Sequence, residues 1–149
     1  GIAEYSYPAG YYDLVVSNLA LHYLADLDDI YRKAFSTLRP GGVFLFNIEH
    51  PVFTAGVRED WVRDTEGRPV CWPVDNYYYP GERTTLFLGQ EVKKQHHTLT
   101  QILMGLIRCG FVLEAVEEAM PDPSMLDLPG MADEMRRPMM LLVKARKPV

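Results

Sequence analysis

Two apolar segments of the sequence are each followed by residues that can take up or release a proton. His22 lies in the stretch "SNLALHYLAD" (17–26), and Glu49 and His50 follow the segment "VFLFNI" (43–48). An imidazole titrates near pH 6.5, so His22 could accept a proton from a reacting group at neutral pH. His22 is equally consistent with a histidine that bonds to a neighbouring carbonyl group and orients its turn. The same two alternatives apply to His50.

Glu49 and His50 are adjacent in the sequence, and adjacent side chains on an extended chain point to opposite sides. Pro51 follows His50 and holds that residue in an extended conformation. We therefore expect at most one of the two side chains to face a common site with His22.

A strand, a helix and a second strand are predicted to position these residues. Residues 12–18 ("YDLVVSN") and 43–48 are rich in β-branched or aromatic side chains, which is typical of strands. Between them, Asp26 can cap a helix whose apolar residues recur at helical spacing, and the segment "PGG" (40–42) is expected to end it. Connections this short make the two strands parallel, with a right-handed crossover.

The predicted strands end near Asn18 and Ile48. Ligands bind just outside the carboxyl ends of the strands in an open α/β sheet. We therefore expect residues 18–23 and 49–51 to lie side by side at one edge of the sheet. This arrangement would bring His22 to a crevice without reference to any motif.

Residues 51–97 are expected to form an aromatic-rich insertion or lid over the substrate side. A connection of this length is far beyond the usual join of about 4–6 residues between core elements. Its segment "DTEGRPVCWPV" suggests a turn between two short strands, with Gly67 near the tip. Tyr78, in a run of three tyrosines, could line an aromatic substrate pocket or could cover an edge of the core.

A metal site is not predicted. Four potential ligands fall near the expected crevice, but they have no recognised ligand spacing; they are Glu49, His50, His96 and His97.

The last third of the chain is expected to hold a helix capped by Thr98 and ended by Gly110, then strands at 111–120 and 139–147. The loop before the last strand contains "MADEMRRP", with two arginines and a glutamate. These residues could form an ion-paired turn or could recognise an anion.

The composition is that of one folded domain of 149 residues with a formal charge of −5. The acidic balance gives no sign of a nucleic-acid partner, and no apolar run reaches the roughly 20 residues that would cross a bilayer. The two cysteines have no C-x-x-C spacing, so we expect free thiols and a cytoplasmic protein.

The segment "YPAGYYDLVVSNLALHYLADLDDIYRKAFSTLRPGGVFLFNIEHP" resembles the C-terminal half of a class I S-adenosylmethionine-dependent methyltransferase. The resemblance rests on the Asp that enters the first strand (Asp13), on the "NLALHY" turn and on "LRPGG" before the second strand. Later segments, including "EHPVFTA", "WPVDNYYYPGER", "HHTLT" and "RRPMMLL", are similar to a bacterial subfamily of small-molecule type with no assigned substrate.

This resemblance implies an α/β Rossmann-like fold with a mostly parallel sheet and an antiparallel last strand inserted beside the fifth strand of the family. It also implies S-adenosylmethionine as cofactor and a small organic acceptor. Three groups of residues are carried over: Ile2, Ala3, Glu4, Asn18, Leu19 and Ala20 on the cofactor side, His22 as the catalytic base, and Tyr23, Glu49, His50, Tyr78 and His96 on the substrate side. The family often has an Asp where this sequence has Ile2, which weakens one expected contact to the adenine.

The family's glycine-rich first strand and turn have no counterpart in the sequence. We therefore expect residues 1–149 to form a single partial methyltransferase domain belonging to a longer parent, with the isolated chain inactive by itself. The strand at 12–18 would then be an exposed sheet edge, through which two copies could pair as a homodimer. The alternative is a non-catalytic fragment or degenerate domain that acts as a binding or dimerisation module.

Overall fold

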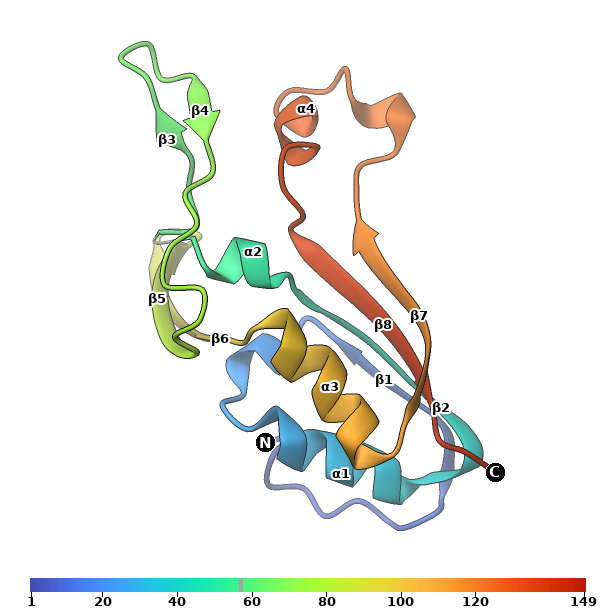
Figure 1. Ribbon diagram of the computed structural model, residues 1–149. Helices are drawn as coiled ribbons and strands as arrows, with labels where there is room; N and C mark the ends of the chain where they lie inside the picture. Colours follow the sequence, from blue (N-terminus) through green and yellow to red (C-terminus); the bar gives the residue numbers. More distant parts are fainter. Residues whose placement is uncertain (57) are drawn as a thin grey trace.

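The computed structural model describes residues 1–56 and 58–149. A mixed sheet forms its centre, with the strand order β1-β2-β8-β7 (Figure 1). β1 (Tyr12–Asn18) runs parallel to β2 (Leu38–Glu49), and β8 (Met140–Arg146) runs antiparallel between β2 and β7 (Val112–Ala119). The parallel pair and the antiparallel last strand are confirmed.

α1 (Leu27–Thr37) joins β1 to β2 and begins as its sequence predicts. The carboxylate of Asp26 accepts a hydrogen bond from the backbone N–H of Asp29, which satisfies a free donor of the first turn. Asp28 and Asp29 also place negative charge at the positive end of the helix dipole.

α3 (Leu99–Cys109) starts with a reciprocal capping box. The Thr98 hydroxyl accepts from the Gln101 backbone N–H, and the Gln101 side chain accepts from the Thr98 backbone N–H. Gly110 ends the helix with a φ of 104°, a left-handed conformation that glycine adopts without a steric penalty.

α1 and α3 pack against each other and cover one face of the sheet. The buried side chains of that face come from alternate strand positions, and they include Phe44, Phe46, Ile48, Leu141, Val143 and Ala145. Leu14 and Val16 point to the opposite face and are 53% and 59% exposed. Neither helix covers this second face.

The start of β2 differs from the expectation. α1 ends at Thr37, and β2 begins at Leu38, so the "PGG" segment lies inside a strand and does not end the helix. Leu38 pairs with Tyr12 before the register shifts, and Gly41 bends the strand with a φ of 77°. A side chain at Gly42 would meet the carbonyl oxygen of Arg39 at 2.9 Å, so the bend needs glycine there.

The 51–97 segment, apart from Val57, which lies outside the described residues, forms one short helix and two hairpins. Its elements are α2 (Pro51–Thr54), β3 (Val62–Arg63), β4 (Pro69–Cys71), β5 (Gly81–Phe87) and β6 (Gln90–His96). β3 pairs with β4 across the predicted turn at Gly67, and β5 pairs with β6.

Two parts of the chain extend past the end of the sheet where β2 leads into α2 (Figure 1). One is the β3–β4 hairpin. The other is the connection from β7 to β8, which contains the 3-10 helix η2 (Pro123–Met125) and α4 (Met131–Glu134). The side chain of Arg136 joins them by donating to the carbonyl oxygens of Pro69 and Val70.

No helix in the described part of the chain is both long enough and apolar enough to cross a membrane.

Candidate functional site

The carboxyl ends of β1 and β2 bring His22 and Glu49 together. The 3-10 helix η1 (Leu21–Tyr23) turns the chain back after β1, so that the ring of His22 lies over the last residue of β2. His22 Nδ1 lies 3.3 Å from the backbone nitrogen of Glu49, and His22 Nε2 lies 3.9 Å from Glu49 Oε1. The predicted juxtaposition of these two residues is confirmed.

The hydrogen bond from the Glu49 amide sets the tautomer of His22. Nδ1 accepts this bond, so the proton of the neutral ring is on Nε2. Burial, followed by the positive charge of Lys94, lowers the pKa of His22 to about 4. His22 is therefore neutral at pH 7, and it can accept a further proton only after Nδ1 gives up the Glu49 amide. Its role as catalytic base stays a prediction with this condition attached.

Lys94 and Glu59 join Glu49 in a buried ionic cluster. Lys94 Nζ lies 2.6 Å from Glu49 Oε1 and 3.0 Å from Glu59 Oε2. The three side chains are 4%, 8% and 7% exposed, in the order Lys94, Glu49 and Glu59. Burial raises the pKa of both glutamates, although Lys94 opposes the shift. One ammonium thus faces two carboxylates away from water.

Sequence reasoning missed Lys94 and Glu59. Ion pairs between residues 45 and 35 positions apart leave no local pattern. The sequence offered only a spacing: Lys94 lies two residues before His96, and residues two apart on a strand point to the same face. The structure shows that both side chains are buried on β6.

His50 points away from this cluster. Its Nδ1 accepts from the backbone N–H of Val52, which caps α2, and its Nε2 lies 2.8 Å from Glu118 Oε1 on β7. Glu49 and His50 therefore face opposite sides, as expected of neighbours at the end of a strand. With both ring nitrogens bonded, His50 holds α2 against the sheet.

The other substrate-side residues occupy different surroundings. Tyr23 is 47% exposed, and its ring centroid lies 4.5 Å from that of His22. His96 is fully buried, with Nδ1 2.7 Å from the Thr54 hydroxyl and Nε2 2.8 Å from the carbonyl oxygen of Tyr77. Tyr78 is 84% exposed. No hydrogen bond among the described residues joins His96 or Tyr78 to His22.

The turn after β1 presents backbone and amide groups at the same edge. Leu19 has a φ of 54°, a left-handed conformation that is uncommon for a residue with a branched side chain. Its N–H donates to the carbonyl oxygen of Asn47, and the Asn47 side-chain amide donates to Asn18 Oδ1 at 3.2 Å. Asn47 Oδ1 is buried and has no partner among the described residues.

The N-terminal residues lie at the surface beside α1. The ammonium of Lys33 donates to the carbonyl oxygen of Ala3, and Glu4 pairs with the N-terminal amine at 2.8 Å. Ile2 contributes to a cavity of about 110 Å³ between β1 and α1, which Ser17 also lines. The predicted cofactor-side residues thus fall in two groups, one at the β1 turn and one at the N-terminus beside α1, where only Ile2 lines the cavity.

A metal ion has no ready site within residues 1–56 and 58–149. No group of three or more His, Cys, Asp or Glu side chains in that part is arranged to hold one.

Comparison with known proteins places this arrangement in a family. Residues 2–46 match the sequence model of a methyltransferase domain. The S-adenosylmethionine-dependent methyltransferase of Mesorhizobium loti is 41% identical, with a TM-score of 0.88 over 98% of this chain and 67% of its own. A Listeria monocytogenes protein, provisionally described as such a methyltransferase, is 45% identical, with a TM-score of 0.94 over 99% of this chain and 67% of its own.

A functionally undescribed protein of Haemophilus influenzae is 28% identical over 145 residues, which is 94% of this chain. The chain spans 56% of the length of that relative. Similarity to the two solved structures extends over almost every residue and includes both hairpins and the antiparallel last strand. The chain therefore belongs to the S-adenosylmethionine-dependent methyltransferase family.

Proposed function

We propose that this chain supplies the acceptor side, and part of the cofactor side, of an enzyme that transfers a methyl group from S-adenosylmethionine to a small organic molecule. One observation carries the proposal. The parallel strands β1 and β2 end side by side, and Asn18, His22 and Glu49 converge there. In α/β sheets this edge is where ligands bind.

The residues at the β1 turn fit a bound S-adenosylmethionine in two respects. Asn18 and Leu19 are exposed, so a ligand can pass along the turn beside them, although the Leu19 N–H is already bonded to the carbonyl oxygen of Asn47. Asn47 Oδ1 is a buried acceptor that would gain a partner from an amino or hydroxyl donor of the cofactor. We assign Asn18, Leu19 and Ala20 to the methionyl part, and Ile2, Ala3 and Glu4 to the adenine.

When bound, the cofactor supplies an electrophilic methyl carbon for an in-line displacement. The chain's own task is to hold the acceptor atom in line and to exclude water. We propose that Tyr23 and Glu49 lie beside the acceptor, with His50, Tyr78 and His96 farther out on the same side. If the acceptor loses a proton, His22 or Glu49 would receive it, and the ammonium of Lys94 would keep Glu49 in the ionised form that can accept a proton.

A second candidate function is a binding or dimerisation module without catalysis. The specific observation in its favour is the apolar sheet face at Leu14 and Val16, which no helix of the described chain covers. The two candidates differ in whether the β1 turn binds the cofactor.

Calorimetry with S-adenosylhomocysteine separates them. The methyltransferase proposal expects binding with a micromolar dissociation constant. Replacing Asn47 with Leu keeps the size of the side chain but removes the free acceptor together with the amide that donates to Asn18 Oδ1, and should weaken binding about tenfold or more, the equivalent of at least one lost hydrogen bond. Gln90→Leu, at the start of β6, is the matched control and should change nothing. The absence of any binding heat would favour the module.

A further inference from the structure

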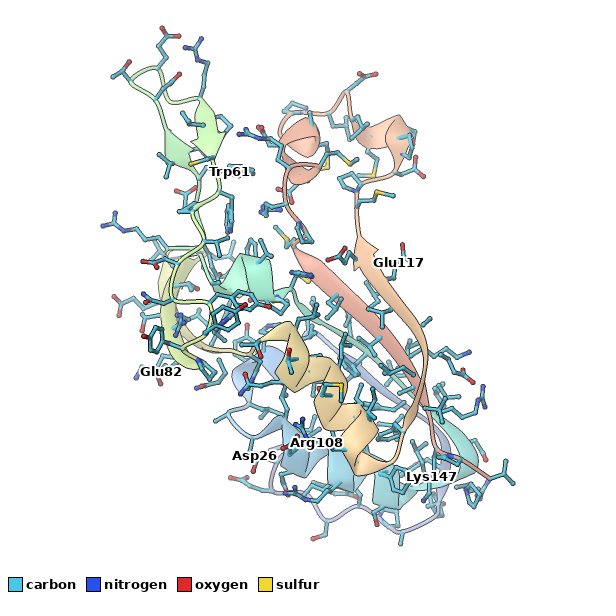
Figure 2. The ribbon with its side chains drawn as sticks, viewed as in Figure 1. Asp26, Trp61, Glu82, Arg108, Glu117 and Lys147 are labelled. Atoms are coloured by element: carbon cyan, nitrogen blue, oxygen red, sulfur yellow. The ribbon has the colours of Figure 1, made fainter. Side chains whose placement is uncertain are left out.

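A second hollow lies on the acceptor side, next to the ionic cluster. It has a volume of about 320 Å³, and its lining comes from α2, the β3–β4 hairpin and the segment before β8: Val52, Trp61, Cys71, Trp72, Val74, Arg136 and Arg137. Trp61, labelled in Figure 2, lies at the base of the hairpin on the side of the α4 segment. Since α2 follows β2 directly, the hollow opens beyond the same strand end as Glu49.

Arg137 is the buried polar group of this pocket. It is 6% exposed, and its guanidinium carbon lies 4.6 Å from the ring centroid of Trp72 and 5.1 Å from that of Phe53. Both terminal nitrogens donate to Glu134, at 2.5 and 3.0 Å. The Nε–H of the same guanidinium is buried without a hydrogen-bond partner among the described residues.

Arg136 closes the pocket from the other side. Its guanidinium stacks on Trp61 at 4.6 Å, pairs with Asp133 at 2.9 Å, and bonds to two carbonyl oxygens of the hairpin. Asp133 and Glu134 neutralise the two arginines from outside the lining. The described lining itself contains two guanidinium groups and no carboxylate, so an anion that enters the pocket competes with Asp133 and Glu134 for the guanidinium donors.

We propose that this pocket binds the carboxylate end of a planar organic acid, which makes such an acid the class of methyl acceptor. The indole rings offer apolar walls for a flat body, and the free Nε–H offers a charge-assisted hydrogen bond to an oxygen. A guanidinium suits a carboxylate better than an ammonium would, because its donors are coplanar. The ion pair between Glu134 and Arg137 is then the contact that an incoming carboxylate competes with. This proposal rests on the proposed function for its biological meaning, but its test does not.

Tryptophan fluorescence reports on this pocket directly, because Trp61 and Trp72 are the only two tryptophans of the chain. The probes are benzoate and its neutral isostere benzamide. We expect a saturable change with both, and at least tenfold tighter binding of benzoate. Arg137→Gln should abolish that preference. Arg68→Gln, on the exposed turn of the hairpin, is the control and should retain it.

A second variant guards against the case in which Arg137→Gln fails to fold. Glu134→Gln frees the terminal nitrogens of Arg137 and should tighten benzoate binding several-fold. Equal affinity for benzoate and benzamide, no saturable change, or benzoate binding that Glu134→Gln leaves unchanged would each overturn the proposal.

Cys71 gives an independent readout at the pocket wall. The ratio of its alkylation rates by iodoacetate and by iodoacetamide should exceed the same ratio at Cys109, because only the first reagent is an anion. Benzoate should slow the reaction of Cys71 and leave that of Cys109 unchanged. Equal ratios at the two cysteines would count against an anion site. Binding of S-adenosylhomocysteine is measured in a separate experiment. A chain that binds S-adenosylhomocysteine but shows no preference for benzoate would refute only the acid pocket, and the opposite result would refute only the methyltransferase proposal.

Discussion

The imidazole of His22 accepts, at Nδ1, a hydrogen bond from the backbone amide of Glu49, across the carboxyl ends of two parallel strands. This bond fixes the ring, its tautomer and the geometry of the turn after β1. It also occupies the lone pair that a catalytic base would use. The role of His22 therefore depends on whether this contact persists when an acceptor binds.

His22 should remain neutral well below pH 6. Burial lowers its pKa to about 4, so between pH 6.5 and 4 the unfolded chain binds a proton that the folded chain does not. Stability contributed by neutral His22 is thus lost as the pH falls through that interval, by about 2 kcal/mol between pH 7 and 5. NMR titration of the ring should give a midpoint near 4, and His22→Gln should remove this part of the pH dependence of unfolding. A midpoint near 6.5 would mean that the ring is not held as described.

Lys94 and Lys93 are neighbours in β6, but Lys94 is buried and Lys93 is exposed. Lys93 therefore serves as the control for a substitution of Lys94. Lys94→Met leaves Glu49 and Glu59 buried without their cation, and should lower the free energy of unfolding by about 3 kcal/mol or more. Lys93→Met removes an exposed pair with Glu82 and should cost less than about 1 kcal/mol. Urea unfolding at pH 7 measures both. Similar losses in the two variants would show that the buried cluster does not hold the insertion in place.

Self-association through the edge of β1 is the third prediction. Within the described residues β1 pairs only with β2, and its apolar Leu14 and Val16 are exposed. Sedimentation velocity over a concentration series should show a dimer, because an unpaired apolar edge recruits another strand. The double variant Leu14→Lys, Val16→Lys should shift the chain to monomer, whereas Leu86→Lys, which is equally apolar and exposed on β5, should not. A wild-type chain that is monomeric throughout would refute the edge contact.

Much of the scaffold could be predicted because its signals are local. β1 has the predicted bounds, and the caps at Asp26 and Thr98 and the stop at Gly110 lie where residue type requires them. The start of β2 could not be predicted in this way, since the "PGG" segment normally ends structure. In this chain the "PGG" segment lies inside β2, whose first residue, Leu38, pairs with Tyr12.

In the candidate site, too, some contacts could be predicted from the sequence and others could not. His22 and Glu49 could be brought together from topology alone, because parallel strands end at a common edge. Lys94 and Glu59 required the tertiary structure, whereas the pairing of Glu134 with Arg137 is a local contact of the ion-paired turn that the sequence allowed. The two glutamates reach their lysine only because the insertion folds back over β2, and no pattern within 51–97 encodes that path.

The most direct test of the account is an NMR titration of the isotope-labelled chain with S-adenosylhomocysteine. The account predicts amide shift changes concentrated at Asn18, Leu19 and Ala20, which extend to Glu49 through the His22 contact. Unchanged amide signals at these residues with millimolar S-adenosylhomocysteine would contradict it.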